Sequence, residues 1–179
     1  MKRRRIAIIG AGWYGCHIGS RLLSAGHDVK VFEKNSSVLS GASLLNQNRL
    51  HLGFHYPRSW NTRLQSRRGY KLFRKYYGDF VEAIDMNIYL ISCAESILDF
   101  ETYCTIMTGS NLDFEDVTNC LPVQIQNVEG AISCDEYVIN PFLAKSYFSR
   151  LLSGSLVCDF QVSECDLTSF SSDYDFVFD

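Results

Sequence analysis

The sequence predicts an α/β fold in which a helix connects two parallel strands, and three observations support that prediction. A β-branched run at Arg5–Ile9 ends at a glycine, as a strand buried on both faces does. Apolar residues between Trp13 and Ala25 recur at helical spacing, and Gly26 follows as a stop. The alternating run Asp28–Glu33 then completes a β-α-β unit of about 30 residues.

The composition excludes several classes of protein. At 179 residues the chain has the length of about one ordinary domain, and its 46% apolar and 21% charged residues are typical of a soluble globular protein. A net charge of -3 gives no reason to expect nucleic acid as a partner. No run approaches the roughly 18 apolar residues that cross a bilayer, so we expect no membrane span and a cytoplasmic location.

The cysteines do not indicate a structural cross-link. There are seven, an odd number, and no two form a CxxC pair, which argues against a disulfide framework and against a zinc site. We therefore expect reduced thiols that are mostly packed inside, and no metal.

The remaining elements are predicted from periodicity and turn residues. We expect helices at 61–77, 98–108 and 142–152, with the basic face of the first one solvated, and strands at 84–92, 131–138, 156–162 and 174–178. The segment 34–57 is too rich in Ser, Asn, Gly and His for a regular element, and such long excursions often carry a ligand.

Gly10, Gly12 and Gly15 form a G-x-G-x-x-G motif between the first strand and the first helix. The first glycine permits the tight turn, the second lets the backbone approach a pyrophosphate, and the third lets helix and strand pack closely. The helix N-terminus, with Trp13 and Tyr14 in its first turn, then offers free N–H groups and a positive dipole end to an anion. The motif in this context predicts a Rossmann-like dinucleotide-binding unit.

Glu33 ends the second strand, 23 residues after Gly10, where a carboxylate can accept hydrogen bonds from both ribose hydroxyls of an adenosine. Lys34 follows it and joins the predicted cofactor-binding set. A 2′-phosphate would be repelled here, so NADP is disfavoured. The glycines and the glutamate alone would also suit an NAD-dependent dehydrogenase.

A second motif makes the chain resemble the FAD-dependent oxidoreductases of the D-amino acid oxidase and glycine oxidase type. Members of that family carry a small-Ala-Ser-x-x-Asn core and a nearby His-x-Gly after the second strand, and here residues 41–53 read GASLLNQNRLHLG. The resemblance implies FAD as the cofactor. It further implies that Ser43 and Asn46 lie along the pyrophosphate and ribityl chain, that Asn48, Arg49 and His51 run beneath the flavin ring, and that Val162 ends a strand and binds the adenine through its backbone.

The resemblance also implies a domain organisation. We expect a discontinuous FAD-binding domain at 1–83 and 140–179 and a partial, β-rich substrate-side subdomain at 84–139. The family continues for about as many residues again, so we expect this chain to be the N-terminal half of such an enzyme, of doubtful activity alone. A non-catalytic nucleotide-binding remnant is the alternative, and a homodimer or a complementing second half is a plausible partner.

No catalytic residue is assigned by the sequence. His51 and His55 are spaced as a metal pair would be on a helix, but Gly53 and Pro57 argue against a helix and no third ligand is evident. Tyr56, Arg58 and Trp60 could line a pocket in which Arg58 pairs with the carboxylate of a small-molecule substrate. An arginine at a helix start is more often solvated, so Arg58 stays outside the predicted site.

Overall fold

The computed structural model describes residues 2–179 and divides into two compact units. The first unit is formed by the chain up to Asn48 together with Asn140–Asp179, and the second by Arg49–Ile139. The first unit is discontinuous, and residues 49–83, which we expected in the FAD-binding domain, lie in the second unit. The reason is that β-strands and a helix from this segment pair and pack with residues 87–139.

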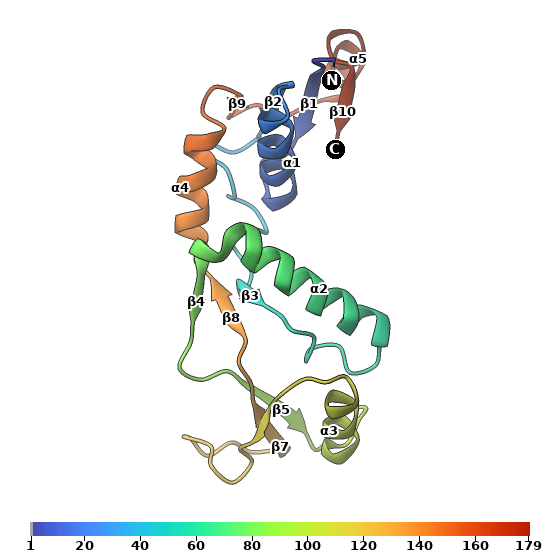
Figure 1. Cartoon of the computed structure of the whole chain (residues 1–179), viewed down its shortest axis with the longest axis vertical. Helices are drawn as coiled ribbons and strands as arrows, with labels where there is room; N and C mark the ends of the chain where they lie inside the picture. The colour runs from blue at the N-terminus through green and yellow to red at the C-terminus, as the bar shows by residue number, and fades with distance from the viewer. Residues whose placement is uncertain (1) are drawn as a thin grey trace. The chain divides into compact units, whose positions relative to one another are not determined.

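A four-stranded parallel sheet forms the centre of the first unit, in the order β10-β1-β2-β9 (Figure 1). Its strands are β1 (Arg5–Ile9), β2 (Asp28–Phe32), β9 (Leu156–Val157) and β10 (Phe176–Phe178). The helices of this unit are α1 (Trp13–Ser24), α4 (Pro141–Leu151) and α5 (Glu164–Asp173). The predicted β-α-β unit is therefore confirmed, with β1 and β2 paired in parallel along their whole length.

The C-terminal part of the first unit differs from the prediction. The strand expected at 156–162 ends at Val157, and helix α5 was not expected. A capping box starts that helix, because the Ser163 side chain accepts from the Asp166 N–H and the Asp166 side chain accepts from the Ser163 N–H. Phe170 of α5 stacks on Phe32 with ring centroids 4.6 Å apart, so the helix contributes to the core beside the sheet.

Two antiparallel three-stranded sheets and two α-helices make up the second unit (Figure 1). One sheet has the order β3-β8-β4, from Arg49–Leu50, Tyr137–Ile139 and Val81–Ala83. The other has the order β5-β7-β6, from Ile88–Ser92, Val128–Ser133 and Glu115–Asp116. The helices are α2 (Trp60–Tyr77), followed by the short 3₁₀ helix η1 (Gly78–Phe80), and α3 (Phe100–Gly109).

The prediction of a single strand at 131–138 is wrong, because the chain forms β7 and β8 in different sheets. Residues 134–136 form the break, where the Cys134 N–H donates to the Asn87 carbonyl and the Glu136 N–H to the Cys134 carbonyl. Leaving one sheet here frees Tyr137–Ile139 to pair with β3 and β4.

The expectation that the basic face of α2 is solvated is wrong for Arg63. Its side chain is buried, donating from Nε to the Ser110 hydroxyl at 2.8 Å and from one terminal nitrogen to the carbonyls of Tyr56 and Pro57 at 2.9 and 2.6 Å. A buried guanidinium needs such acceptors to offset its lost hydration. Arg63 thereby ties α2 to the segments on both sides of it.

All seven cysteines are free thiols, but fewer are buried than we expected. Cys16 and Cys134 lie inside, whereas Cys93, Cys120 and Cys165 are exposed. Within residues 2–179, no helix combines the length and the apolar character that crossing a membrane requires.

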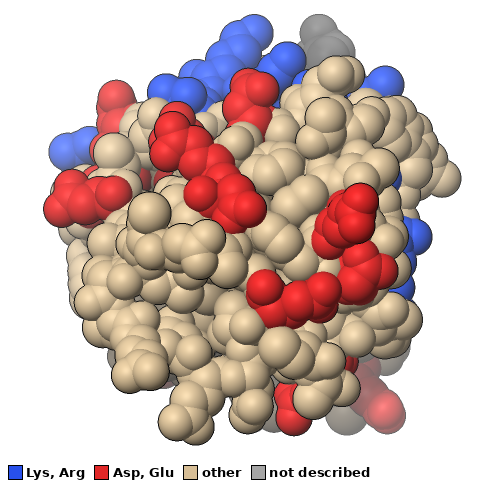
Figure 2. Space-filling view, turned by 90° about the horizontal axis from the view of Figure 1, so that it is seen from below, with Lys and Arg blue, Asp and Glu red and all other residues tan. Residues whose placement is uncertain are grey.

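Charged side chains are dispersed on the face of the molecule that Figure 2 shows. Asp and Glu form separate small groups among uncharged side chains, and Lys and Arg are seen mainly at the margins of the view. Among the described residues visible in this view, there is no continuous basic surface of the kind that binds a phosphate backbone.

Gly15 provides a test of how closely α1 must approach β1. A Cβ at Gly15 would lie 1.9 Å from the backbone oxygen of Gly10. We expect Gly15→Ala to lower the free energy of unfolding by about 1–3 kcal/mol or more, because backbone cannot move aside as a side chain can. Gly69→Ala, in α2 with open space around its Cβ position, is the control and should raise the free energy of unfolding by about 0.5–1 kcal/mol. Equal effects of both substitutions in urea unfolding would contradict this account.

Candidate functional site

The glycine-rich loop leads from the end of β1 into α1 in the first unit. Gly10 has a φ of +91°, a conformation that side chains rarely adopt, and it lets the chain turn sharply out of the strand. Gly12 is the N-cap residue of α1, and Gly15 faces the backbone of Gly10 so closely that no Cβ would fit. Gly10 and Gly15 thus have the structural roles expected of them, and the approach of Gly12 to a pyrophosphate stays a prediction.

The N-terminus of α1 is suited to an anion. Its N-cap residue makes no side-chain cap, and its first turn contains no acidic side chain that would neutralise the positive end of the helix dipole. The hydroxyl of Ser43 lies beside this end, where it accepts a hydrogen bond from the Trp13 N–H at 3.1 Å. The second sequence motif is thereby brought to the first, 30 residues away in the chain.

Glu33 is buried, with 7% of its surface exposed, and it holds the loop in place. One carboxylate oxygen accepts from the Ala11 N–H at 2.8 Å, and the other accepts from the backbone and side-chain nitrogens of Asn35 at 2.9 and 2.6 Å. A carboxylate offers about four acceptor positions, so these three hydrogen bonds leave room for a further donor. Binding of a ribose by Glu33 stays a prediction, and the structure adds a supporting role in the glycine-rich loop.

The other predicted residues of the first unit differ in how they are held. Trp13 packs edge-on against Phe148 at 5.5 Å, whereas Tyr14 is 86% exposed and Lys34 is exposed. Asn46 donates to the Ala42 carbonyl and accepts from the Asn48 N–H, and so shapes the loop that carries Ser43. Their contacts with a cofactor stay predictions.

We predicted that Val162 ends a strand, and it does not. β9 stops at Val157, and Val162 lies in the segment that leads to α5, packed against the cluster of Ala7, Phe32 and Phe170. The residue at the strand end beside Glu33 is Val157, whose carbonyl accepts from the Glu33 N–H at 2.8 Å. The chain leaves the strand here because Asp159 has a φ of +55°, which is not an extended conformation. Adenine binding by the Val162 backbone stays a prediction.

Arg49 and His51 belong to the second unit, where they meet a buried carboxylate that the sequence analysis did not select. The side chain of Glu136 is fully buried, and it accepts from the Leu52 N–H at 2.6 Å and the Tyr89 hydroxyl at 2.7 Å. A terminal nitrogen of Arg49 and Nδ1 of His51 each lie 3.4 Å from Oε2 of Glu136, the same oxygen that accepts from Tyr89. The Arg49 guanidinium, the His51 imidazole and two neutral donors thus surround one buried acceptor.

The surroundings of Glu136 determine its charge. Burial raises the pKa of its carboxyl, but hydrogen bonds from His51, Tyr89 and the Leu52 N–H act in the opposite direction and outweigh burial, so the pKa lies below its ordinary value. Burial and the bond to this carboxylate raise the pKa of Tyr89 far above its usual range, so its hydroxyl remains a donor. The cluster therefore contains a carboxylate held in its ionised form.

Asn87, which the sequence analysis did not select, completes this cluster. Its side-chain oxygen accepts from Arg49, and its amide nitrogen donates to Cys134 Sγ at 3.1 Å. The one signal in the sequence was Glu136 itself, a carboxylate inside a strand-like apolar run. Within residues 2–179 no group of three or more His, Cys, Asp and Glu side chains is arranged to hold a metal ion. The rings of His51 and His55 instead stack, with centroids 5.7 Å apart.

Glu136→Gln tests whether this buried charge stabilises the second unit. We expect a loss of about 3–5 kcal/mol in the free energy of unfolding at neutral pH, because the part-buried Arg49 guanidinium would lose its anion. Since the pKa of Glu136 is depressed in the folded protein, its stabilising effect is complete above the ordinary value of 4.5 and is lost as the pH falls through the folded-state pKa.

The measurement is urea unfolding as a function of pH, with Glu129→Gln on the exposed side of β7 as the matched control. The difference in stability between wild type and Glu136→Gln should shrink on acidification, while Glu129→Gln should follow wild type throughout. A difference that is independent of pH would show that Glu136 acts through packing and not through its charge.

Known proteins resemble this chain in sequence and in fold. Residues 8–75 match the family model of the NAD(P)-binding Rossmann-like domain. Over 160 residues, 88% of this chain, it is 42% identical to the FAD-dependent monooxygenase FPY4 of Fusarium mangiferae. The chain spans 42% of the length of that relative, which is less than half.

Solved structures of oxidases share the fold. L-α-glycerophosphate oxidase from Mycoplasma pneumoniae, solved with FAD bound, matches 91% of this chain and 46% of its own with a TM-score of 0.71 and 16% identity. Glycine oxidase from Geobacillus kaustophilus matches 87% of this chain and 46% of its own with a TM-score of 0.63 and 23% identity. The predicted fold class is thus confirmed: the chain contains a Rossmann-like FAD/NAD(P)-binding domain and has the fold of FAD-dependent oxidoreductases.

Proposed function

We propose that the first unit binds FAD and that the chain supplies the dinucleotide site of an FAD-dependent oxidoreductase. The observation that supports this most directly is the glycine-rich loop: Gly10, Gly12 and Gly15 bring the backbone to the N-terminus of α1, whose N-cap residue has no side chain, and a buried Glu33 stands beside it. The 42% identity to an FAD-dependent monooxygenase supports FAD over a nicotinamide cofactor.

The residues present fit such a group. The first-turn N–H groups of α1 other than that of Trp13, in a turn that contains no acidic residue, would hold the pyrophosphate, and the remaining acceptor position of Glu33 would hold a ribose hydroxyl. Ser43, placed by its bond to the Trp13 N–H, would lie along the phosphates. When bound, FAD supplies the redox chemistry by taking up and releasing electrons at its flavin ring, while the protein orients it.

The type of reaction is a finer proposal. The sequence relative is named a monooxygenase, whereas the solved structures of similar fold are named oxidases. We propose the monooxygenase type, because the 42% identity to FPY4 is far greater than the 16% and 23% identities to the two oxidases.

The two reaction types can be separated by the reductant that bleaches the bound flavin in the absence of oxygen. Bleaching by NADH or NADPH would support the monooxygenase, and bleaching by amino or 2-hydroxy acids would support the oxidase. If neither group of reductants bleaches the flavin, the chain binds FAD without turning over by itself.

Gly12→Val tests the cofactor site. A Cβ here would lie 3.3 Å from the hydroxyl of Ser43, and the two additional methyl groups would fill the space expected for the pyrophosphate. Overpacking of this kind costs about 1–3 kcal/mol, so we expect FAD affinity, measured by quenching of flavin fluorescence, to fall by about 5- to 150-fold.

Gly154→Val is the matched control, because it lies in the same unit with nothing within 4 Å of its Cβ position. It should retain wild-type affinity for FAD. Wild-type affinity in Gly12→Val, or an affinity of the wild-type protein for NAD⁺ equal to that for FAD, would refute the proposed site.

A further inference from the structure

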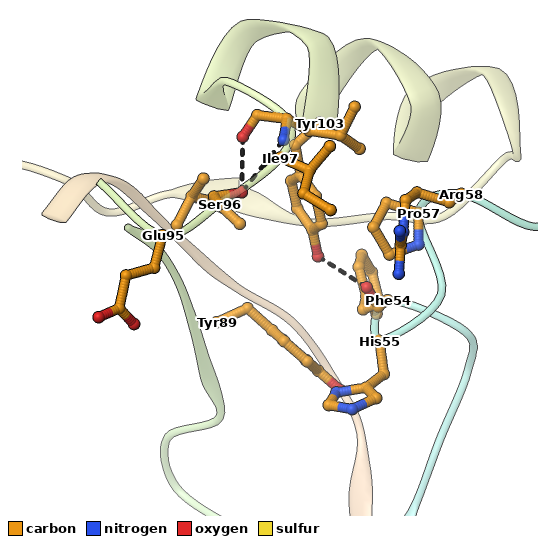
Figure 3. Close-up of a pocket in the computed structure, with 11 residues that line it drawn as sticks. Phe54, His55, Pro57, Arg58, Tyr89, Glu95, Ser96, Ile97 and Tyr103 are labelled. Atoms are coloured by element: carbon orange, nitrogen blue, oxygen red, sulfur yellow. Dashed lines mark hydrogen bonds between the residues drawn. The ribbon is translucent and has the colours of Figure 1, made fainter. Parts of the chain in front are cut away.

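We propose that a pocket in the second unit is a binding site for a small carboxylic acid with an apolar body, whose carboxylate pairs with Arg58. The pocket has a volume of about 280 Å³ and is lined by residues of the segments 54–58 and 95–98, of β5, and by Tyr103 of α3 (Figure 3). Pockets for drug-sized ligands usually measure about 300–1,000 Å³, so this one suits a molecule of smaller size.

The walls of the pocket favour an apolar ligand body. Tyr103 and Tyr89 contribute their rings, but the Tyr103 hydroxyl donates to the Phe54 carbonyl at 3.0 Å and the Tyr89 hydroxyl donates to Glu136 at 2.7 Å. Ser96 is occupied as well, since its hydroxyl donates to the Leu98 carbonyl. Besides His55, Arg58 and Glu95, the surfaces left for a ligand are the faces of aromatic rings and aliphatic side chains, which favour a flat or aliphatic group.

Ile97 supplies a second reason to expect an apolar body. This side chain lines the pocket and is 77% exposed, so most of its apolar surface is in contact with water. A ligand in the pocket would cover it and remove its surface from water, which is favourable.

Arg58 supplies the anion-binding group. Within residues 2–179 its guanidinium makes no hydrogen bond or ion pair, and it stands beside Phe54 and Pro57 at the pocket (Figure 3). The acidic residue that also lines the pocket, Glu95, directs its carboxylate away from the other side chains drawn (Figure 3). A planar guanidinium with free donors beside an apolar pocket matches a carboxylate, which it can bind through two parallel hydrogen bonds.

The proposed site is independent of the FAD site. All its lining residues belong to the second unit, whereas the glycine-rich loop and Glu33 belong to the first. Failure of one proposal therefore leaves the other standing.

Phenylacetate is a suitable probe, with phenylacetamide as its uncharged counterpart. Both would be titrated into the full chain without FAD, and binding would be followed by backbone amide NMR. We expect saturable shifts at residues 54–58 and 95–98 for phenylacetate, and an affinity at least ten-fold lower for phenylacetamide. Arg58→Gln should weaken phenylacetate at least ten-fold and leave phenylacetamide unchanged.

Arg68→Gln is the matched control, since Arg68 is an exposed arginine of α2 outside the pocket, and it should bind phenylacetate as wild type does. Gly12→Val should also bind phenylacetate normally, even though it loses FAD. Thermal unfolding of Arg58→Gln should match that of wild type, because the side chain makes no contact that stabilises the fold.

Several results would overturn the proposal. One is absence of saturable binding, another is equal affinity for the acid and the amide, and a third is wild-type binding of phenylacetate by Arg58→Gln. Inorganic phosphate that binds the same residues as tightly as phenylacetate would show a site for anions in general, in which the apolar walls have no part.

Discussion

The first unit depends on one steric constraint, the contact of Gly15 with the backbone of Gly10. Because a Cβ would lie 1.9 Å from the Gly10 oxygen, only glycine allows α1 to start this close to the end of β1. Gly19 continues the close packing one turn later, where a Cβ would lie 3.1 Å from Val31. The position of the helix end, and with it the anion site, follows from this contact. Glu33 and Ser43 then add hydrogen bonds to a loop whose path is already determined.

The second unit depends on an electrostatic constraint and not on a steric one. A fully buried carboxylate is costly unless it is paired and hydrogen-bonded, and Glu136 is both. Its partners come from β3, from β5 and from the segment between β3 and α2. These elements must therefore assemble together for the hydrogen bonds of Glu136 to form. Removing the carboxylate would leave the Arg49 guanidinium without an anion and the Tyr89 hydroxyl without its acceptor.

Tyr89 links this buried charge to the proposed ligand pocket. Its hydroxyl is held by Glu136, and its ring forms part of the pocket wall. The hydrogen bond therefore orients the ring, and an oriented ring is a better surface for a ligand than one that must be ordered on binding. The cluster around Glu136 and the pocket thus share Tyr89, and both lie within the second unit.

Local patterns in the sequence were sufficient for the β-α-β unit. Gly10, Gly12 and Gly15 act within a few residues of one another, and the strands on either side are specified by short β-branched runs, so the fold class and the FAD-type motif could be read directly. The capping box at Ser163 and Asp166 was equally local, and it could have predicted α5.

Only the tertiary structure decided how the second unit is assembled and where Val162 lies relative to β9. Arg49 meets Asn87 and Glu136 across 38 and 87 residues, and Arg63 meets Ser110 across 47, contacts that no periodicity records. Strand-like residues at 131–138 are divided between two sheets, and Glu136 at the break accepts from the Leu52 N–H, 84 residues away. The physical reason is common to all of these: a buried polar group is satisfied by whichever partner the assembled fold brings to it, and that partner is chosen by three-dimensional packing and not by neighbours in the chain.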